Sequence, residues 1–235
     1  MTISSTPTAQ AASAASMEEH IYASIQHAVL TQRLTSDSRL PELTLSRIYE
    51  VNRSVVRRAL ERLAAAGIVV LRRNQSAVVA SPGAEETRQL FAARRHVEAE
   101  VMRLSAGQLD AATRKAVAKI VADEQQAHME GIHDDRIHLS LDFHKRLAGA
   151  CPNQVLGAIL QDLTLRTSIA VALYKVPGMA ACYRAGDHHD ILEALLQGDG
   201  ERAAAAACTH LDYLEERLNY ATRMRQNDLA AILGG

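Results

Sequence analysis

The sequence has few aromatic residues and few cysteines. Tryptophan is absent, there are two phenylalanines, and aromatic residues make up 3% of the chain. Alanine and leucine dominate instead, and both favour helices over strands. The three cysteines, Cys151, Cys182 and Cys208, are odd in number and lack a C-x-x-C spacing. This argues against a disulfide framework and suits a reducing, cytoplasmic environment.

Long apolar runs and basic leader segments are missing as well. No stretch approaches the roughly 18 uncharged apolar residues that a membrane span requires, so no membrane association is expected. The first sixteen residues contain no lysine or arginine, unlike a secretory signal or a transit peptide. We therefore expect residues 1–17 to form a disordered tail.

The chain does contain enough apolar sequence for a sizeable core, at 48% of 235 residues, and a local concentration of positive charge. Although the net charge is −1, six arginines and one acid, Glu61, lie between Arg53 and Arg73. A small basic module on a nearly neutral chain is typical of a protein that contacts phosphate groups.

Residues 18–80 follow the element order of a winged helix-turn-helix. Apolar residues at helical spacing predict three helices, over 18–33, 43–49 and 53–66. Two apolar runs around a polar tip predict a β-hairpin with strands at 68–71 and 77–80. Arg72 and Arg73 at this tip could reach a phosphate or the minor groove.

The helix predicted over 53–66 has the form of a DNA-recognition helix, with Asn52 as its N-cap. Arg53 and Arg57 lie one turn apart beside the apolar stripe, with Ser54 and Arg58 beyond them. Arginine can bind guanine through two hydrogen bonds in the major groove. An arginine-rich face that is merely solvated is about equally compatible with this pattern.

Ser81-Pro82-Gly83 interrupts the pattern and predicts a linker over 81–83. A helical domain over 84–227 and a tail over 228–235 are expected after it. The helices of this domain are predicted over 84–107, 110–130, 134–150, 153–174, 180–197 and 200–226. The fold class is therefore mainly α, a winged helix-turn-helix followed by an all-α helical bundle.

Three of the ten histidines, His144, His188 and His210, lie in three different predicted helices. Neutral imidazoles from neighbouring helices can bind one divalent ion in a bundle core. Histidines this far apart in sequence carry no local geometric signal, however, and ordinary core or surface histidines are the more common case.

The N-terminal part of the chain, residues 22–80, resembles the DNA-binding domain of the GntR family of bacterial repressors. The matching stretches are IYASIQHAVL, RLPELTLSRIYEVNRSVVRRALERLAAAGIV and a wing ending in VVAS. The resemblance implies that Arg53 and Arg57 contact DNA. The sequence departs from the family pattern at three positions: Leu43 replaces a basic DNA contact, Glu50 replaces a turn glycine, and Ser76 replaces the wing-tip glycine. These departures predict an operator that differs from the common operator of the family.

Residues 84–220 resemble the FCD domain, the effector domain of the FadR subfamily within GntR. The resemblance implies that the three histidines and an Asp one turn before the first of them bind a metal such as Zn, Ni or Mn. A carboxylate effector then completes the coordination. Ser140 stands at the position of that Asp, so the metal is expected to be held without it, held weakly, or absent. The residues that carry the resemblance are Arg94 with Glu98, Phe143-His144 with Asn153, and His188-x-x-Ile191 with His210.

Arg94 is the residue that the resemblance places at the effector carboxylate, which a guanidinium suits. The alternative is a surface pair with Glu98, worth a few tenths of a kcal/mol. Asn153 is equally expected as a helix N-cap, and Asp187 and His189 as supporting or surface groups. The further candidates for the effector pocket are Ser140, Asn153, Arg166 and, more weakly, Tyr174.

These features together predict a ligand-responsive transcription regulator that is not an enzyme. We expect a cytoplasmic homodimer that binds a double-stranded DNA operator, represses a catabolic operon and responds to a small carboxylated metabolite. One alternative is a metal-dependent hydrolase of the helical-bundle type, although HExxH and paired Glu-x-x-His motifs are absent. Another is a regulator with a vestigial effector pocket, which Ser140 favours.

Overall fold

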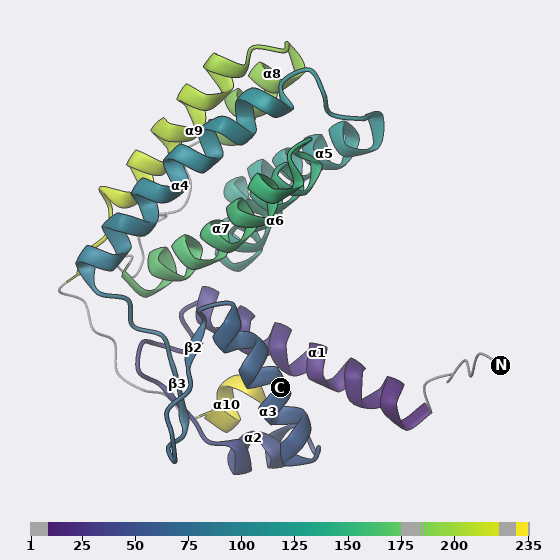
Figure 1. Ribbon diagram of the computed structural model, residues 1–235, viewed down its shortest axis with the longest axis vertical. Coiled ribbons are helices and arrows are strands. Elements are labelled where there is room, and N and C mark those ends of the chain that lie inside the picture. The colour runs from purple at the N-terminus through teal and green to yellow at the C-terminus, as the bar shows by residue number, and fades with distance from the viewer. Residues whose placement is uncertain (1–8, 175–183, 185, 221–228, 235) are drawn as a thin grey trace. The chain divides into compact units, whose positions relative to one another are not determined.

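The computed structural model describes residues 9–174, 184, 186–220 and 229–234, and its chain forms two compact units (Figure 1). The first unit combines both ends of the sequence, Met1–Ser81 and Arg223–Gly235, and the second comprises Pro82–Thr222. The division between them falls within the predicted linker 81–83.

The first unit is a helical fold with a small sheet. It contains α1 (Ala9–Leu30), β1 (Arg39–Leu40), α2 (Glu42–Ile48), α3 (Arg53–Ala65), β2 (Val69–Val70), β3 (Ala77–Val79) and α10 (Leu229–Leu233). The strands are antiparallel in the order β1-β3-β2, and α3 packs against both α1 and α2. This is the predicted winged helix-turn-helix, and β1, which pairs with β3, adds a third strand to the predicted hairpin.

The apolar stripes of α1 and α3 form the core of this unit. Ile21, Ile25 and Val29 recur every fourth residue on α1 and are fully buried. On α3 the buried stripe consists of Val55, Val56, Ala59, Leu60 and Leu63. Because this stripe faces the core, the arginine-bearing face of α3 is left in solvent.

Two residues with positive φ frame α3. Glu50 (φ 52°) lies in the turn before the helix, where it adopts the left-handed conformation that favours glycine, and Gly67 (φ 70°) follows the end of the helix. Asn52 is the N-cap residue as predicted, but its side chain makes no capping hydrogen bond. Its backbone carbonyl accepts from the Val55 N–H at 3.0 Å.

Both predicted tails contain helix. α1 begins at Ala9, so residues 9–17 are helical where a disordered tail was expected, because their alanine-rich sequence has high helix propensity. α10 occupies most of the predicted C-terminal tail, contacts α1 and buries Leu229 and Leu233. The rest of these two tails, residues 1–8, 228 and 235, lies outside the described residues.

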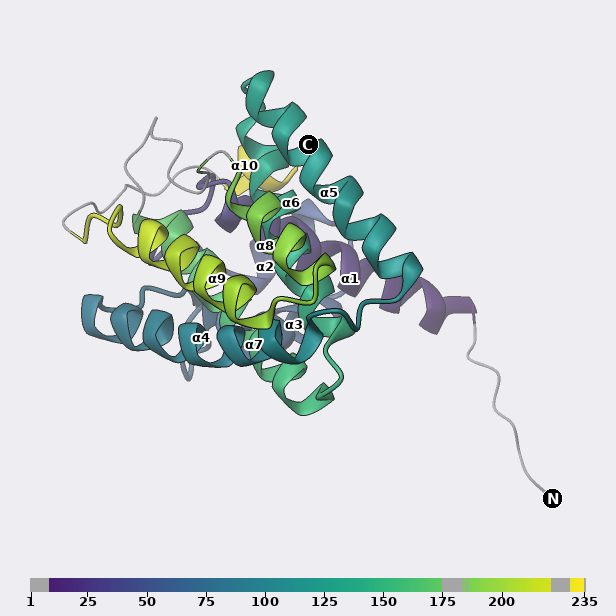
Figure 2. The same ribbon diagram turned by 90° about the horizontal axis from the view of Figure 1, so that it is seen from above.

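The second unit is an all-α bundle. Its described helices are α4 (Ala84–Ser105), α5 (Ala111–Met129), α6 (His133–Ala150), α7 (Gln154–Tyr174), α8 (Asp187–Leu196) and α9 (Gly200–Glu215). α4 packs against α7 and α9, α6 packs against α5 and α7, and α8 packs against α9. Figure 2 shows α4 and α9 side by side. All six helices contribute to one apolar core.

Two helices of this unit are shorter than predicted. α8 begins at Asp187, directly after Gly186 with its positive φ of 94°, and not at residue 180. α9 ends at Glu215, short of the predicted residue 226. Residues 175–183, 185 and 221–228, which include parts of both predictions, lie outside the described residues.

α7 is long and apolar enough to cross a membrane by length and composition alone. Over its most apolar window, however, 56% is buried inside the protein, where α7 contacts α4 and α6. A buried core helix of a soluble protein has the same length and composition, so α7 is weak evidence for a membrane span. α7 also contains Asp162 and Arg166, so it is not an uncharged apolar stretch of the kind that was expected to be absent.

Candidate functional site

Three histidines from three helices meet in the core of the second unit. His144 lies on α6, His188 on α8 and His210 on α9, and all three are buried. One ring nitrogen of each lies within 4.8 Å of those of the other two. The Nε2 atoms of His144 and His188 are 3.2 Å apart. The fold therefore brings together rings that the sequence places far apart.

A carboxylate lies at the opposite edge of each imidazole ring. A hydrogen bond to one ring nitrogen fixes the proton there, orients the ring and leaves the lone pair of the other nitrogen available. The three pairs join histidine Nδ1 to a carboxylate oxygen: His144 to Glu98 at 2.7 Å, His188 to Glu124 at 2.6 Å, and His210 to Asp187 at 3.2 Å.

Burial and neighbouring charges keep two of these rings neutral and one carboxylate ionised. Burial lowers the pKa of His144 to about 3, and it also lowers the pKa of His210 although Asp187 acts in the opposite direction. Burial alone would raise the pKa of Glu98, but the Arg94 guanidinium and the His144 ring hold it well below its usual range. Neutral imidazoles are the form that binds metal cations.

The charges and the unpaired atoms of the cluster fit a cation. The three carboxylates and the two guanidinium groups paired with them, Arg94 with Glu98 and Arg184 with Asp187, leave one net negative charge around the rings. Within the described residues, His210 Nε2 and Glu124 Oε1 are buried without a hydrogen-bond partner. Leaving a buried polar atom without a hydrogen bond lowers the free energy of unfolding by about 1–3 kcal/mol. A divalent transition metal at the ring nitrogens would engage His210 and balance the charge.

Ser140 lies one helical turn before His144 on α6 and is half-buried. Its neutral hydroxyl is a poorer ligand for a divalent cation than a carboxylate. Asp142 is exposed, so it does not replace the missing acid. The negative charge near the rings comes instead from the three carboxylates that contact Nδ1.

Arg94 is buried, so the alternative of a surface ion pair is wrong. Its side chain is 2% exposed and that of Glu98 is 0% exposed. The Nε atom donates to Glu98 at 2.7 Å, and Nη1 donates to Thr167 Oγ1 at 2.7 Å. Nη2 is buried and has no hydrogen-bond partner among the described residues. Arg94 is thus a fixed guanidinium with a donor left for the acceptor atom of a ligand.

The other effector candidates have contacts elsewhere. Asn153 is exposed, and its Oδ1 accepts from a backbone N–H at 3.1 Å, which is the capping arrangement. Arg166 is 37% exposed and pairs with carboxylates of α4 and α7. Tyr174 donates through its hydroxyl to the Pro82 carbonyl. These contacts do not include the three histidines.

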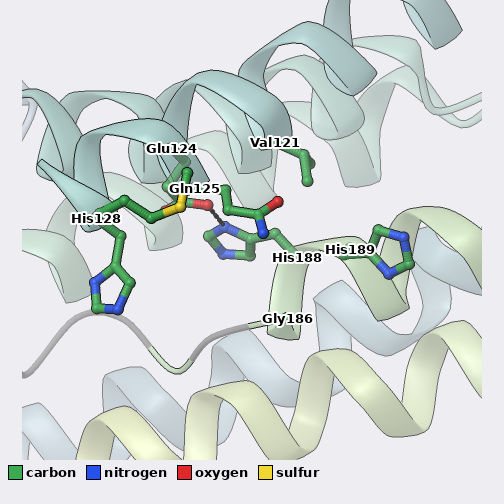
Figure 3. A pocket seen from close by; sticks show the side chains of 8 residues that line it. Val121, Glu124, Gln125, His128, Gly186, His188 and His189 are labelled. Carbon is green, nitrogen blue, oxygen red and sulfur yellow. Dashed lines mark hydrogen bonds and ion pairs between the residues drawn. The ribbon is translucent and has the colours of Figure 1, made fainter.

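A pocket of about 370 Å³ lies beside the His188–Glu124 pair (Figure 3). Figure 3 shows the hydrogen bond between these two side chains, with Gln125 beside the ring and His189 turned away from it. His189 is exposed and pairs with Asp190, so it is a surface group. The pocket is lined by Val121, Glu124, Gln125, His128, Met129, Gly186, His188 and His189.

On the first unit, two arginines of α3 share one carboxylate. The side chains of Arg53 and Arg57 are each 60% exposed, and both contact Glu42, the first residue of α2. Nη2 of Arg53 is 3.0 Å from Oε2, and Nε and Nη2 of Arg57 are each 3.0 Å from one of the two carboxylate oxygens. The bond from Arg57 is the largest cause that lowers the pKa of Glu42.

The remaining DNA-contact candidates also lie at the surface of this unit. Arg58 is bound to Glu18 of α1 at 2.8 Å, and Ser54 is exposed. Arg72 and Arg73 are exposed in the hairpin loop, which Asn74 turns with a φ of 57°. The structure thus places the candidates on α3 and on the wing.

Contacts made by three carboxylates were not predicted. Glu98 was expected only as a partner of Arg94, and its bond to His144 had no signal in the sequence. Glu124 lies on α5, 64 residues before His188, and only the packing of the bundle reveals the pair. Glu42 directly precedes Leu43, and its contacts with Arg53 and Arg57 join two helices, so they had no local signal in the sequence.

Two family descriptions match the sequence. Residues 89–213, more than half of the chain, match the FCD domain, and residues 17–79 match the bacterial regulatory proteins of the gntR family. These matches point to transcription regulators and not to enzymes. No curated protein matches the sequence.

Solved structures share this fold. E. coli McbR/YncC is 18% identical with a TM-score of 0.68, and the match covers 83% of this chain and 93% of that chain. A Rhodococcus sp. RHA1 protein assigned as a GntR transcriptional regulator is 20% identical with a TM-score of 0.70, covering 86% and 96%. At these identities the similarity establishes the fold.

Proposed function

The chain belongs to the GntR family of bacterial regulatory proteins and carries an FCD domain, so it is a ligand-responsive DNA-binding transcription regulator, and we propose that a small carboxylate effector controls it through a metal site. The histidine cluster carries this proposal. His144, His188 and His210 face one another, and each is held from behind by a carboxylate.

The three histidines would hold a divalent ion such as Zn, Ni or Mn through the ring nitrogens that face one another. When bound, the ion supplies positive charge and open coordination positions for an anionic oxygen. Because Ser140 offers no carboxylate, an effector carboxylate contributes more of the negative charge at the ion than it would beside an aspartate.

Arg94 would orient the effector. Its Nη2 is a buried donor without a partner in the described residues, and Glu98 and Thr167 fix the guanidinium in place. A second carboxylate oxygen or another acceptor of the ligand would satisfy this donor. Ser140 is half-buried one turn from His144 and could add a hydroxyl contact. Asn153 and Arg166 are weaker candidates, since their side chains are engaged elsewhere.

The DNA-binding surface would be the exposed face of α3 and the hairpin loop. Arg53 and Arg57 would enter the major groove of an operator, with Ser54 and Arg58 at its edge. Arg72 and Arg73 would contact the backbone or the minor groove. Leu43 is 51% exposed and could contact a thymine methyl group.

We further infer that the regulator works as a cytoplasmic homodimer and represses a catabolic operon. A symmetric dimer presents two recognition helices to a palindromic site, as DNA-binding domains of this kind require. Sedimentation of the full chain at micromolar concentration tests the assembly, and a monomer there would refute it. Transcription from the bound promoter, with and without protein, tests repression.

Elemental analysis of protein purified without a histidine tag tests the metal site. We expect about one transition-metal ion per chain, and a lower melting temperature after chelation, since a ligand that binds only the folded state stabilises it by mass action. Small carboxylates should raise the melting temperature more in metal-loaded than in stripped protein.

The matched variants are His188→Ala and His189→Ala, adjacent residues of which only the first lies in the cluster. His188→Ala should lose the metal, and His189→Ala should retain it. A wild-type protein with neither metal nor a chelator effect would favour the vestigial pocket. The hydrolase alternative is not favoured by either family match.

Arg53→Ala and Arg57→Ala test the DNA surface. Each should weaken binding to the specific site by about 1–3 kcal/mol. Fluorescence anisotropy with labelled operator at fixed salt provides the measurement. If both variants bind as tightly as the wild type, the assignment of α3 as recognition helix is wrong.

A further inference from the structure

One acidic residue contacts both arginines that are proposed to read DNA bases. Glu42, at the start of α2, contacts Arg53 and Arg57, which lie one turn apart on α3. Its side chain is 25% exposed, against 60% for each arginine. The carboxylate is therefore less accessible to solvent than the two guanidinium groups that it contacts.

The atoms used in these contacts leave the outer edge of Arg57 available. Nε and Nη2 of Arg57 bind the two oxygens of Glu42 side-on. A guanidinium has five N–H groups, so Nη1 and the second hydrogen of Nη2 still form a pair that points away from Glu42. This end-on pair matches O6 and N7 of guanine. Glu42 can thus hold Arg57 while Arg57 binds a base.

The same carboxylate changes how the arginines respond to phosphate. Two free guanidinium groups at the surface would attract any DNA backbone, whatever its sequence. With Glu42 bound to both, the local charge falls from two positive charges to one. The carboxylate thereby weakens contacts that ignore sequence, and it restricts the rotation of two long side chains before DNA arrives.

We propose that Glu42 is a specificity-determining residue of the DNA surface, which aligns Arg53 and Arg57 for base edges and lowers their attraction to phosphate. The inference rests on the proposed role of these two arginines. It predicts that removing the negative charge of Glu42 weakens binding to the operator and strengthens binding to unrelated DNA.

Glu42→Gln tests the proposal, with full-length protein and two DNA duplexes of equal length. One is the duplex that the wild-type protein selects from a randomised pool, and the other has its bases scrambled. We expect the ratio of the two affinities to fall by at least about tenfold, in the range that one bidentate base contact provides. For scrambled DNA, the slope of log affinity against log salt should steepen by about 0.9, as for one added phosphate contact.

Glu18→Gln is the matched control. Glu18 also accepts from two arginines of α3, Arg58 and Arg62, at 2.8 and 3.3 Å, and the substitution changes the charge of the same unit by the same amount. It should strengthen binding to both duplexes without changing their ratio. An unchanged ratio in Glu42→Gln, or an equal fall in Glu18→Gln, would overturn the proposal, because net charge alone would then explain the data.

A double-mutant cycle of Glu42→Ala and Arg57→Ala gives an independent readout. If Glu42 acts through Arg57, its loss should cost less operator affinity when Arg57 is already absent. Equal losses in both backgrounds would contradict the inference while leaving the role of Arg57 intact. Operator binding that is unaffected by Arg57→Ala would instead refute the proposed recognition helix itself.

Discussion

Replacing Arg94 tests how much a single buried charge contributes to the stability of the fold. Its removal leaves the Glu98 carboxylate in the core without the guanidinium that balances its charge, and with only the hydrogen bond to the neutral His144 ring. Breaking a buried pair in this way costs about 3–5 kcal/mol, and we expect Arg94→Ala to lower the free energy of unfolding by that amount. Urea denaturation measures it. Arg166→Ala, at a half-exposed position, should stay within about 0.5 kcal/mol, and equal effects would contradict the buried pair.

The buried histidines predict how metal-free protein responds to acid. The pKa of His144 falls from its ordinary value of 6.5 to about 3 in the folded chain because the ring is buried. Between these values the unfolded chain binds a proton that the folded chain does not, so stability decreases as the pH falls below about 6.5. The slope should approach about 1.4 kcal/mol per pH unit for each such histidine.

Urea denaturation in chelator between pH 7 and pH 5 measures this slope. His144→Gln should reduce it, because the variant has no imidazole to protonate on unfolding. His189→Gln, at an exposed position of α8, should leave it as in the wild type. A wild-type slope in His144→Gln would show that other groups control the acid response.

At the residue scale, the candidate ligands could be predicted from the sequence better than their surroundings. The three histidines and Arg94 could be named because a family resemblance points to single positions. Glu124 could not be named, since a contact between α5 and α8 has no local period in the sequence. The exposure of Arg94 was also open, because an i,i+4 pair looks the same in sequence whether water or protein surrounds it.

At the scale of elements, replacement by alanine of two glycines at the contact of α6 and α7 should change the stability of the fold in different directions. A Cβ on Gly157 of α7 would clash with the backbone carbonyl oxygen of Ala148. Overpacking of this kind costs about 1–3 kcal/mol. A Cβ on Gly149 of α6 would meet only the flexible side chain of Gln161 at 3.4 Å, and alanine has the higher helix propensity, by about 1 kcal/mol.

Thermal unfolding of Gly157→Ala and Gly149→Ala checks this pair. The first variant should melt below the wild type and the second at or above it. If both variants melt alike, the close approach of α6 and α7 at Gly157 is not the determining contact.

The positions of most helices could be predicted from the sequence, but the residues at which some helices begin and end could not. The limits of α2, α3 and α4 to α7 were close to prediction because apolar periodicity and breakers such as Gly67 agree there. The start of α1 at Ala9 differs from prediction because the absence of lysine and arginine argues against a signal or transit peptide but does not argue against a helix. α10 was missed because a five-residue apolar segment has no periodicity of its own, and only packing on α1 makes it a helix.

For the whole molecule, α10 predicts that the far end of the chain stabilises the DNA-binding unit. Leu233 is 6% exposed, and α10 contacts α1. We expect Leu233→Ala to destabilise the first unit by about 2–5 kcal/mol and to leave the unfolding transition of the second unit unchanged. Calorimetry resolves the two transitions. Ala231→Ser, exposed on the same helix, is the control, and a shift in the second transition alone would refute the assignment.

Two hydrogen bonds of Tyr174 reduce the entropy cost of folding a chain with this topology. The second unit is an insertion into a discontinuous host, so docking α10 closes a loop of well over a hundred residues. The hydroxyl of Tyr174 binds the Pro82 carbonyl, and its own carbonyl accepts from the Asn219 N–H at 2.9 Å. Tyr174 thus holds the beginning and the end of the inserted unit close together. Once the insertion has folded, the loop left to close is only its short flanking segments, and the entropy cost of closure falls accordingly.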